Sequence, residues 1–191
     1  MISINNAVQF QHLIWDRILE EAKVIVDATC GNGHDLLYLA ERAQSGAHIY
    51  AIDIQEQAIR NTQVLLDTAK IKDDVAISYL QGSHDHALAQ WIEEEAIDLV
   101  VFNLGYLPGA DHSLMTHADQ TLEAVASALP KLSKQGMITL VAYPGTPQGM
   151  AEKEALHNYL ASLPQKEFNV CHWTPMNQIN QPPVIYMIQK R

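Results

Sequence analysis

The sequence predicts an α/β fold: a seven-stranded, mostly parallel sheet, doubly wound, with helices on both faces and an antiparallel last strand. Strand-like and helix-like segments alternate for five units along the chain, which is typical of βα repeats around a parallel sheet. The strands are apolar runs without polar alternation, as in Val24–Val26, which indicates burial on both faces. Two strand-like segments then follow one another, which predicts a terminal hairpin.

The first half of the chain supplies the N-terminal helix and three of the repeats. A helix is predicted at about 5–22, because Val8, His12, Trp15, Ile18 and Leu19 fall on one side of it. We expect this helix to pack on the sheet or to cover a ligand site. The remaining elements are strands at 23–28, 47–53 and 75–80, and helices at 34–44, 55–68 and 84–93.

The second half begins with a strand at 97–102 and a loop at 103–116. A helix follows from about 117, and Pro130 predicts that it ends near Leu129 or bends there. The remaining elements are a strand at 136–143, a helix at 149–162, and strands at about 167–174 and 183–189. Pro182 and Pro183 bound the last strand from outside, where a missing N–H is harmless.

Composition indicates a single globular domain over residues 1–191, since the chain is 48% hydrophobic and 18% charged. No apolar run approaches the roughly 18 residues that span a bilayer, and the N-terminus does not resemble a secretory signal. Cys30 and Cys171 form no CxxC pair, so we expect a cytoplasmic protein with incidental thiols. The oligomeric state stays open, a homodimer included.

The formal net charge of −10 disfavours nonspecific binding to nucleic acid, which depends on Lys and Arg neutralising phosphates. An RNA substrate would therefore meet a local basic surface or be held mainly through its bases. His84 and His86 flank Asp85, but no further cluster has metal-ligand spacing, so no metal site is expected.

A glycine turn directly after the first strand is the main candidate for a ligand site. Gly31 and Gly33 permit backbone conformations that other residues avoid, and a helix N-terminus follows them. Asp53 comes 20 residues after Gly33, at the tip of the second strand, where a carboxylate can accept hydrogen bonds from ribose hydroxyls. No third glycine follows, which argues against NAD and for an adenosine ligand without a pyrophosphate. The alternative is an ordinary βαβ turn with a fortuitous acid.

The segment DATCGNGHD, followed by AIDI, resembles the first two motifs of S-adenosylmethionine (SAM)-dependent methyltransferases. The resemblance implies the Rossmann-like class I fold, a glycine turn that holds the amino-acid end of SAM, and Asp53 on its ribose. It also places His84, in the loop after the third strand, near the adenine.

Three other segments leave the carboxyl ends of strands with polar side chains: 82–86, 103–113 and 143–149. Ligands of such sheets bind at these ends. Asn103-Leu104-Gly105-Tyr106 resembles the NPPY-type motif of methyltransferases that act on amino nitrogens, in which the Asn and a backbone carbonyl accept hydrogen bonds from the amine. Asp111 or His112 is a candidate to take a proton from the amine. The alternative interpretation of this segment is a plain turn.

The order of DATCGNGHD, AIDIQ, NLGYLPGADHS, AYPG and NQINQPP over the whole chain is similar to the small bacterial methyltransferases labelled rRNA methylases. Members of that family methylate the 5-aminomethyl group of 2-thiouridine at the tRNA wobble position. The chain has Ala110 and His112 where the family usually has GGDK, and Thr146 where it usually has YPGH.

This resemblance implies a SAM-dependent N-methyltransferase whose substrate is the anticodon region of tRNA. Its implied cofactor residues are Asp27, Gly31, Asn32, Gly33, Asp53, Gln55, Ser83, His84, Asn103 and Leu104. Its implied catalytic residues are Asn103, Tyr106 and Asp111, and its implied substrate residues are Gly105, His112, Thr116, Tyr143, Asn177 and Asn180. Two alternatives stay open: SAM-dependent methylation of rRNA, a protein side chain or a small amine, and a non-catalytic nucleoside-binding protein.

Overall fold

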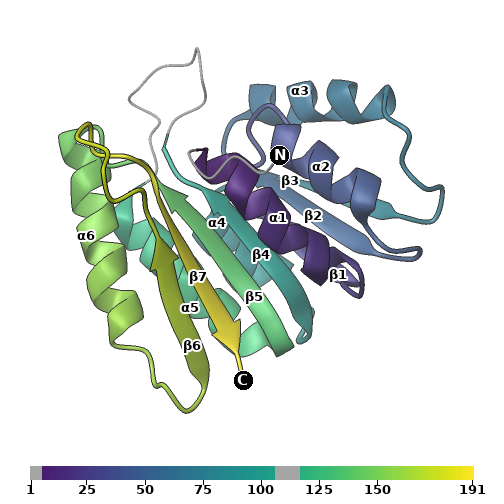
Figure 1. The fold of residues 1–191 in the computed structure, drawn as a ribbon. Coiled ribbons are helices and arrows are strands. Elements are labelled where there is room, and N and C mark those ends of the chain that lie inside the picture. The colour runs from purple at the N-terminus through teal and green to yellow at the C-terminus, as the bar shows by residue number, and fades with distance from the viewer. Residues whose placement is uncertain (1–5, 106–116) are drawn as a thin grey trace.

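The computed structural model describes residues 6–105 and 117–191. Seven strands form one sheet in the order β3-β2-β1-β4-β5-β7-β6, and β7 runs antiparallel to both of its neighbours. Figure 1 shows this twisted sheet with helices on either side. The predicted fold class, including the antiparallel last strand, is confirmed.

The element bounds agree with the predicted ones to within a few residues for most of the chain. The strands are β1 Val24–Asp27, β2 His48–Asp53, β3 Ala76–Gln81, β4 Ile97–Asn103, β5 Leu132–Ala142, β6 Phe168–Trp173 and β7 Val184–Lys190. The helices are α1 Ala7–Leu19, α2 His34–Arg42, α3 Glu56–Asp67, α4 His84–His86, α5 Ala118–Lys131 and α6 Pro147–Ala161, with a π-helical turn, η1, at Ala87–Trp91.

Both faces of the central strands β1 and β4 are buried, as their unalternating sequences predict. Ile25 and Leu99 pack on one face with residues of α1, α2 and α3. Val26 and Phe102 pack on the other face with residues of η1, α5 and α6. Each apolar side chain on β1 and β4 therefore has a helix to pack against, whichever side it points to.

The N-terminal helix α1 packs on the sheet, which is one of the two placements that its periodicity predicts. Asn6 caps it by accepting a hydrogen bond from the backbone N–H of Gln9 at 3.1 Å. The fully buried Trp15 ring donates a hydrogen bond to Thr139 Oγ1 on β5 at 3.0 Å. This anchors the helix across the centre of the sheet.

The end of α5 and the start of β5 differ from the prediction. The helix runs two residues beyond Leu129, to Lys131, since Pro130 lies in its last turn and removes a single intrahelical hydrogen bond. Lys190 Nζ donates to the carbonyls of Pro130 and Leu132 at 2.9 and 2.7 Å, which satisfies acceptors at this helix end. The strand then begins at Leu132, four residues earlier than predicted.

Among the described residues, no helix combines the length and the apolar character that crossing a bilayer requires. Cys30 is buried and Cys171 is exposed. Burial and the nearby carboxylate of Asp27 raise the pKa of the Cys30 thiol. A nucleophilic thiolate at the glycine turn is therefore disfavoured.

The sheet register positions the candidate site. Asp27 on β1 lies beside Ala51 and Val101 on its two neighbouring strands. Asp53 and Asn103 each lie two residues further along those strands. Asp27 is therefore recessed between two more exposed strand ends, at the edge where ligands of parallel sheets bind.

Candidate active site at the carboxyl ends of the strands

The glycine turn joins β1 to α2 and is bonded to the strand next to it. Cys30 N–H donates to the Ile52 carbonyl at 2.9 Å, and Gly33 N–H donates to the Cys30 carbonyl at 2.8 Å. Gly31 and Gly33 adopt φ of 53° and 85°, in the left-handed region that favours glycine. The predicted conformational need for glycine at both positions is confirmed.

Gly33 lies close against helix α3. A Cβ at Gly33 would lie 2.9 Å from Oγ1 and 3.0 Å from Cα of Thr62 on α3. The Thr62 hydroxyl also donates to the Gly31 carbonyl at 2.9 Å. The second glycine thus lets α3 dock on the turn.

Asp53 caps the turn from the end of β2. Its Oδ2 accepts a hydrogen bond from Gly31 N–H at 3.0 Å, and its Oδ1 accepts one from Gln55 N–H at 2.9 Å. Burial raises the pKa of Asp53, and these backbone hydrogen bonds oppose that shift. The side chain of Asn32 lies beside it on the turn and accepts a hydrogen bond from Asn61 Nδ2 at 2.9 Å. Each Asp53 oxygen keeps a second lone pair, which suits the ribose hydroxyls that the sequence predicts.

Asp27 is the most electrostatically costly group at this edge. Its side chain is buried, and Oδ1 accepts from Thr29 N–H at 3.2 Å. Oδ2 has no hydrogen-bond partner among the described residues. Burial, aided by the nearby carboxylates of Asp35 and Asp53, raises the pKa of Asp27 well above its usual range.

Three carboxylates therefore gather around the turn, and a cationic ligand group would relieve their repulsion. SAM carries an ammonium and a sulfonium, so the residues present fit it. Asp27 would face the positively charged amino-acid end, and Asp53 would face the ribose.

Ser83 and His84 follow β3, next to the tip of β2. Gly82 N–H donates to the Asp53 carbonyl at 2.9 Å, which ties this loop to the turn. His84 is buried edge-on against Phe102, with ring centroids 5.7 Å apart. Its Nε2 has no partner within the described part of the chain, and burial lowers its pKa. A neutral imidazole with a buried, unpartnered nitrogen thus lies beside the turn.

Asn103 ends β4, which borders β1 on the side opposite to β2. Its backbone N–H donates to Thr29 Oγ1 at 2.7 Å, and Leu104 N–H donates to the Val141 carbonyl at 2.9 Å. Leu104 is buried, and Gly105 follows with φ of 132°. The polar end of Asn103 is thus held between the glycine turn and β5.

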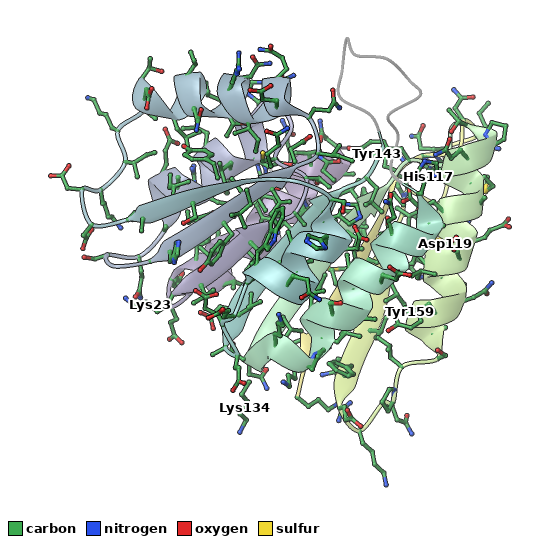
Figure 2. All side chains as sticks on the ribbon, turned by 180° about the vertical axis from the view of Figure 1, so that it is seen from behind. Lys23, His117, Asp119, Lys134, Tyr143 and Tyr159 are labelled. Carbon is green, nitrogen blue, oxygen red and sulfur yellow. The ribbon has the colours of Figure 1, made fainter. Side chains whose placement is uncertain are left out.

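Tyr143 follows β5 and meets the Asn103 side chain. Its ring is 38% exposed, yet desolvation and the charge of Asp35 raise its pKa to about 12, against a hydrogen bond from Asn103 that lowers it. Tyr143 is therefore a neutral phenol at physiological pH. In Figure 2, Tyr143 and His117 lie at the same edge of the molecule, while Lys23 and Lys134 lie at the opposite edge.

Two of the remaining predicted residues lie apart from this group. Asn177 and Asn180 lie exposed in the loop between β6 and β7. Asn180 instead lines a cavity of about 240 Å³ with Ala7 and Trp173. The structure describes no atoms of four predicted residues, Tyr106, Asp111, His112 and Thr116, which lie outside the described ranges.

Two residues that the sequence did not assign lie at the centre of the site. Asp35 Oδ2 accepts a hydrogen bond from Asn103 Nδ2 at 3.1 Å, and Asp35 Oδ1 lies 2.7 Å from His12 Nε2. An acid in the first helical turn after the glycine turn, two residues beyond Gly33, was the available signal for Asp35. No local pattern marks His12, because its partner is 23 residues away in the sequence.

Among residues 6–105 and 117–191, no three His, Cys, Asp or Glu side chains are grouped so that they could hold a metal ion. The described groups at this edge are carboxylates, an amide, a phenol and backbone groups. They suit binding a cationic nucleoside and aligning an acceptor nitrogen.

Comparison with known proteins agrees with this site. The family model for "Putative rRNA methylase" matches residues 49–189. The tRNA (mnm(5)s(2)U34)-methyltransferase of Arabidopsis thaliana chloroplasts is 34% identical over 193 residues, which cover 96% of this chain and 69% of that protein.

Two solved structures share the fold over the full chain. A putative rRNA-methylase of Clostridium thermocellum has a TM-score of 0.91 and 34% identity, and the match covers 99% of this chain and 100% of that one. A putative methyltransferase of Streptococcus mutans in complex with SAH has a TM-score of 0.86 and 33% identity, with the same coverage. This chain belongs to the putative rRNA methylase family and is a class I SAM-dependent methyltransferase.

Proposed function

We propose that this protein methylates the nitrogen of a 5-aminomethyl-2-thiouridine at the wobble position of tRNA, giving the 5-methylaminomethyl product. The relative from Arabidopsis supports this reaction, because its name specifies the product nucleoside, mnm(5)s(2)U34, and the match covers 96% of this chain. We further propose that residues 1–191 act as one domain, since the sheet runs from β1 near the N-terminus to β7 near the C-terminus.

The observation that carries the proposal is the position of Asn103. It ends the strand adjacent to β1, and its backbone is bonded to Thr29 of the turn segment that follows β1. An amide oxygen there can accept a hydrogen bond from an amine and so aim the nitrogen lone pair at a methyl group held over the turn. Tyr143, on the other side of Asn103, offers a half-exposed ring edge to the base.

The reaction needs alignment more than covalent help from the protein. SAM supplies a methyl group on a sulfonium, so the amine lone pair forms the new N–C bond while the S–C bond breaks and its electrons return to sulfur. A primary alkyl ammonium has a pKa near about 10, so it must lose one proton before attack. Asp111 and His112 remain the proposed acceptors of that proton.

The direct test combines the purified protein, SAM and tRNA from a strain that lacks this methylation. We expect mass analysis of the digested tRNA to show the aminomethyl nucleoside converted to its monomethyl form. Methylation of rRNA in place of tRNA would contradict the proposal and would support the substrate that the family description names.

Asn103→Ala tests the role of the amide. We expect methylation to fall about 100-fold, as misplacing a reacting group commonly does, while the Kd for SAM stays within about threefold of the wild-type value. Asn158→Ala, on the exposed side of α6, is the matched control and should retain full activity. A wild-type rate in Asn103→Ala would rule out the acceptor role.

A further inference from the structure

The carboxylate of Asp35 joins three elements at the acceptor side of the site. Its Oδ2 accepts the hydrogen bond from Asn103 Nδ2 at the end of β4, and its Oδ1 meets His12 Nε2 of α1. The Asp35 and His12 side chains are only 14% and 18% exposed. The contact is thus largely sheltered from water. A charge-assisted hydrogen bond is strong in such a sheltered position.

This contact determines which way the Asn103 amide faces. An ionised carboxylate only accepts hydrogen bonds, so the partner must be the amide nitrogen. The amide oxygen of Asn103 consequently faces away from Asp35. The amine lone pair must stay free to attack the methyl group, so the amine has to be oriented through its N–H groups by an acceptor, and the amide oxygen supplies one.

We propose that Asp35, held in place by His12, is a positioning residue that presents the Asn103 carbonyl oxygen to the acceptor amine, so that helix α1 completes the active site. This inference rests on the proposed N-methyltransferase function. Without the carboxylate, the amide can rotate and offer its NH₂ group to the amine, which either opposes the amine N–H groups or occupies the lone pair that must attack.

The rings around His12 hold it in place. The His12 ring stacks on Tyr38 of α2 with centroids 3.9 Å apart and lies 4.9 Å from the Trp15 ring. The Tyr38 hydroxyl donates to Asp16 at 2.6 Å, and the Arg42 guanidinium covers the Tyr38 ring at 3.7 Å. This stack fixes the imidazole plane, so His12 can hold Asp35 in one rotamer.

Asp35 could instead bind the ammonium of SAM directly, since it belongs to the carboxylate group around the turn. The two roles predict different kinetics. A positioning residue affects kcat and leaves cofactor affinity intact, whereas a cofactor ligand changes the Kd for SAM.

The test measures kcat, the KM for tRNA and the calorimetric Kd for SAM in three variants. Asp35→Asn should lower kcat about 100-fold, with the Kd for SAM within about threefold of the wild-type value. His12→Phe keeps the stack and loses the hydrogen bond, so kcat should fall about tenfold, the cost of about 1.4 kcal/mol in the barrier. His12→Gln can donate an amide N–H to Asp35 and should recover kcat to within about threefold of wild type.

His48→Phe is the matched control, because His48 is also half-buried and bonded, to Ser78 Oγ at 2.8 Å, but at the far end of β2. Its kcat should equal that of the wild type. A parallel loss of SAM affinity and kcat in Asp35→Asn would overturn the proposal, as would His12→Gln being no better than His12→Phe.

A readout without turnover separates this proposal from the proposed function. The ¹⁵N side-chain amide signal of Asn103, assigned through Asn103→Ala, should shift in Asp35→Asn and His12→Phe and remain near its wild-type position in His12→Gln and His48→Phe. If the wild type does not methylate tRNA, the proposed substrate fails, and this signal still decides the contact. An unchanged Asn103 signal in Asp35→Asn would overturn the proposal by itself.

Discussion

Asp27 places a charged oxygen in the core of the site with no donor for it among the described residues. Such a group is costly in the absence of a ligand, because burial and two neighbouring carboxylates disfavour its ionised form. A bound cation removes this electrostatic cost, and the free energy so recovered strengthens the binding of the cation. The site thus gives up stability for affinity toward a positively charged cofactor.

Asp27→Asn should therefore stabilise the ligand-free protein and weaken SAM binding. The pKa of Asp27 is raised in the folded state, so between about 4 and that raised pKa the native state binds more protons than the unfolded state. Its contribution to stability consequently falls as pH rises through this window. We expect the variant to melt at least about 3 °C higher at pH 7.5 and to lose this pH dependence, in thermal scans between pH 4 and 8.

The Kd of Asp27→Asn for SAM should rise about tenfold or more, since a hydrogen bond to a charged group contributes about 1.5–3 kcal/mol. Asp73→Asn, on an exposed loop, should change neither quantity. A lower melting temperature for Asp27→Asn would mean that the ligand-free protein already satisfies this carboxylate.

At the scale of elements, the glycine turn depends on how closely α3 approaches it. A side chain at Gly33 would have to adopt a positive φ, and it would also collide with the backbone and side chain of Thr62. Gly46 has a similar φ of 73°, but a Cβ there would meet nothing within 4 Å. The two positions therefore separate backbone strain from the packing of α3.

Gly33→Ala should destabilise the protein more than Gly46→Ala does. The strain of a left-handed backbone alone costs of order 1–2 kcal/mol, and overpacking adds typically about 1–3 kcal/mol. We expect urea unfolding to show a larger loss of unfolding free energy for Gly33→Ala than for Gly46→Ala. Adding Thr62→Ala to Gly33→Ala should recover part of that extra loss. Equal losses at both glycines would show that α3 moves aside freely.

The alternation of buried strands and amphipathic helices was enough to predict the sheet, its antiparallel last strand and most element bounds. The start of β5 could not be predicted, because residues 132–135 are mostly polar and Gln135 has a φ of 69°. They join the sheet through long-range contacts: Leu132 pairs with Ile97, and Ser133 Oγ donates to Asp98 Oδ1 at 2.6 Å.

The site shows the same division between local and long-range information. Gly31, Asp53 and Asn103 follow strand ends, so their place at one edge follows from the topology alone. Their hydrogen-bond partners do not. Asp35 reaches Asn103 across 68 residues, and no property of either residue in the sequence indicates that contact.

At the scale of the whole molecule, three segments beside the acceptor edge carry no charged residue although the chain carries a net charge of −10. No Asp, Glu, Lys or Arg occurs in residues 6–15, 143–151 or 174–183. These segments adjoin one another: Phe10 stacks on Trp173 with centroids 4.8 Å apart, and Ala142 pairs with Val184. These three segments thus offer a surface without acidic side chains next to the proposed acceptor site, which permits a polyanion to approach without cations to attract it.

We therefore expect tRNA to bind through its bases, with little dependence on salt. The logarithm of affinity should fall with the logarithm of salt concentration by a slope smaller than about 2, whereas proteins that neutralise six to ten phosphates show about 5 to 9.

Met176 and Ile179, 98% and 93% exposed in the loop before β7, would contact the bases. Met176→Glu with Ile179→Glu should weaken binding about tenfold or more in anisotropy titrations at 50–200 mM salt, because the new charges repel phosphates. Val64→Glu adds a charge at an exposed apolar position of α3 and should leave affinity near the wild-type value. A steep salt slope in the wild type would instead place the RNA on a basic surface elsewhere, because an uncharged edge releases few counterions.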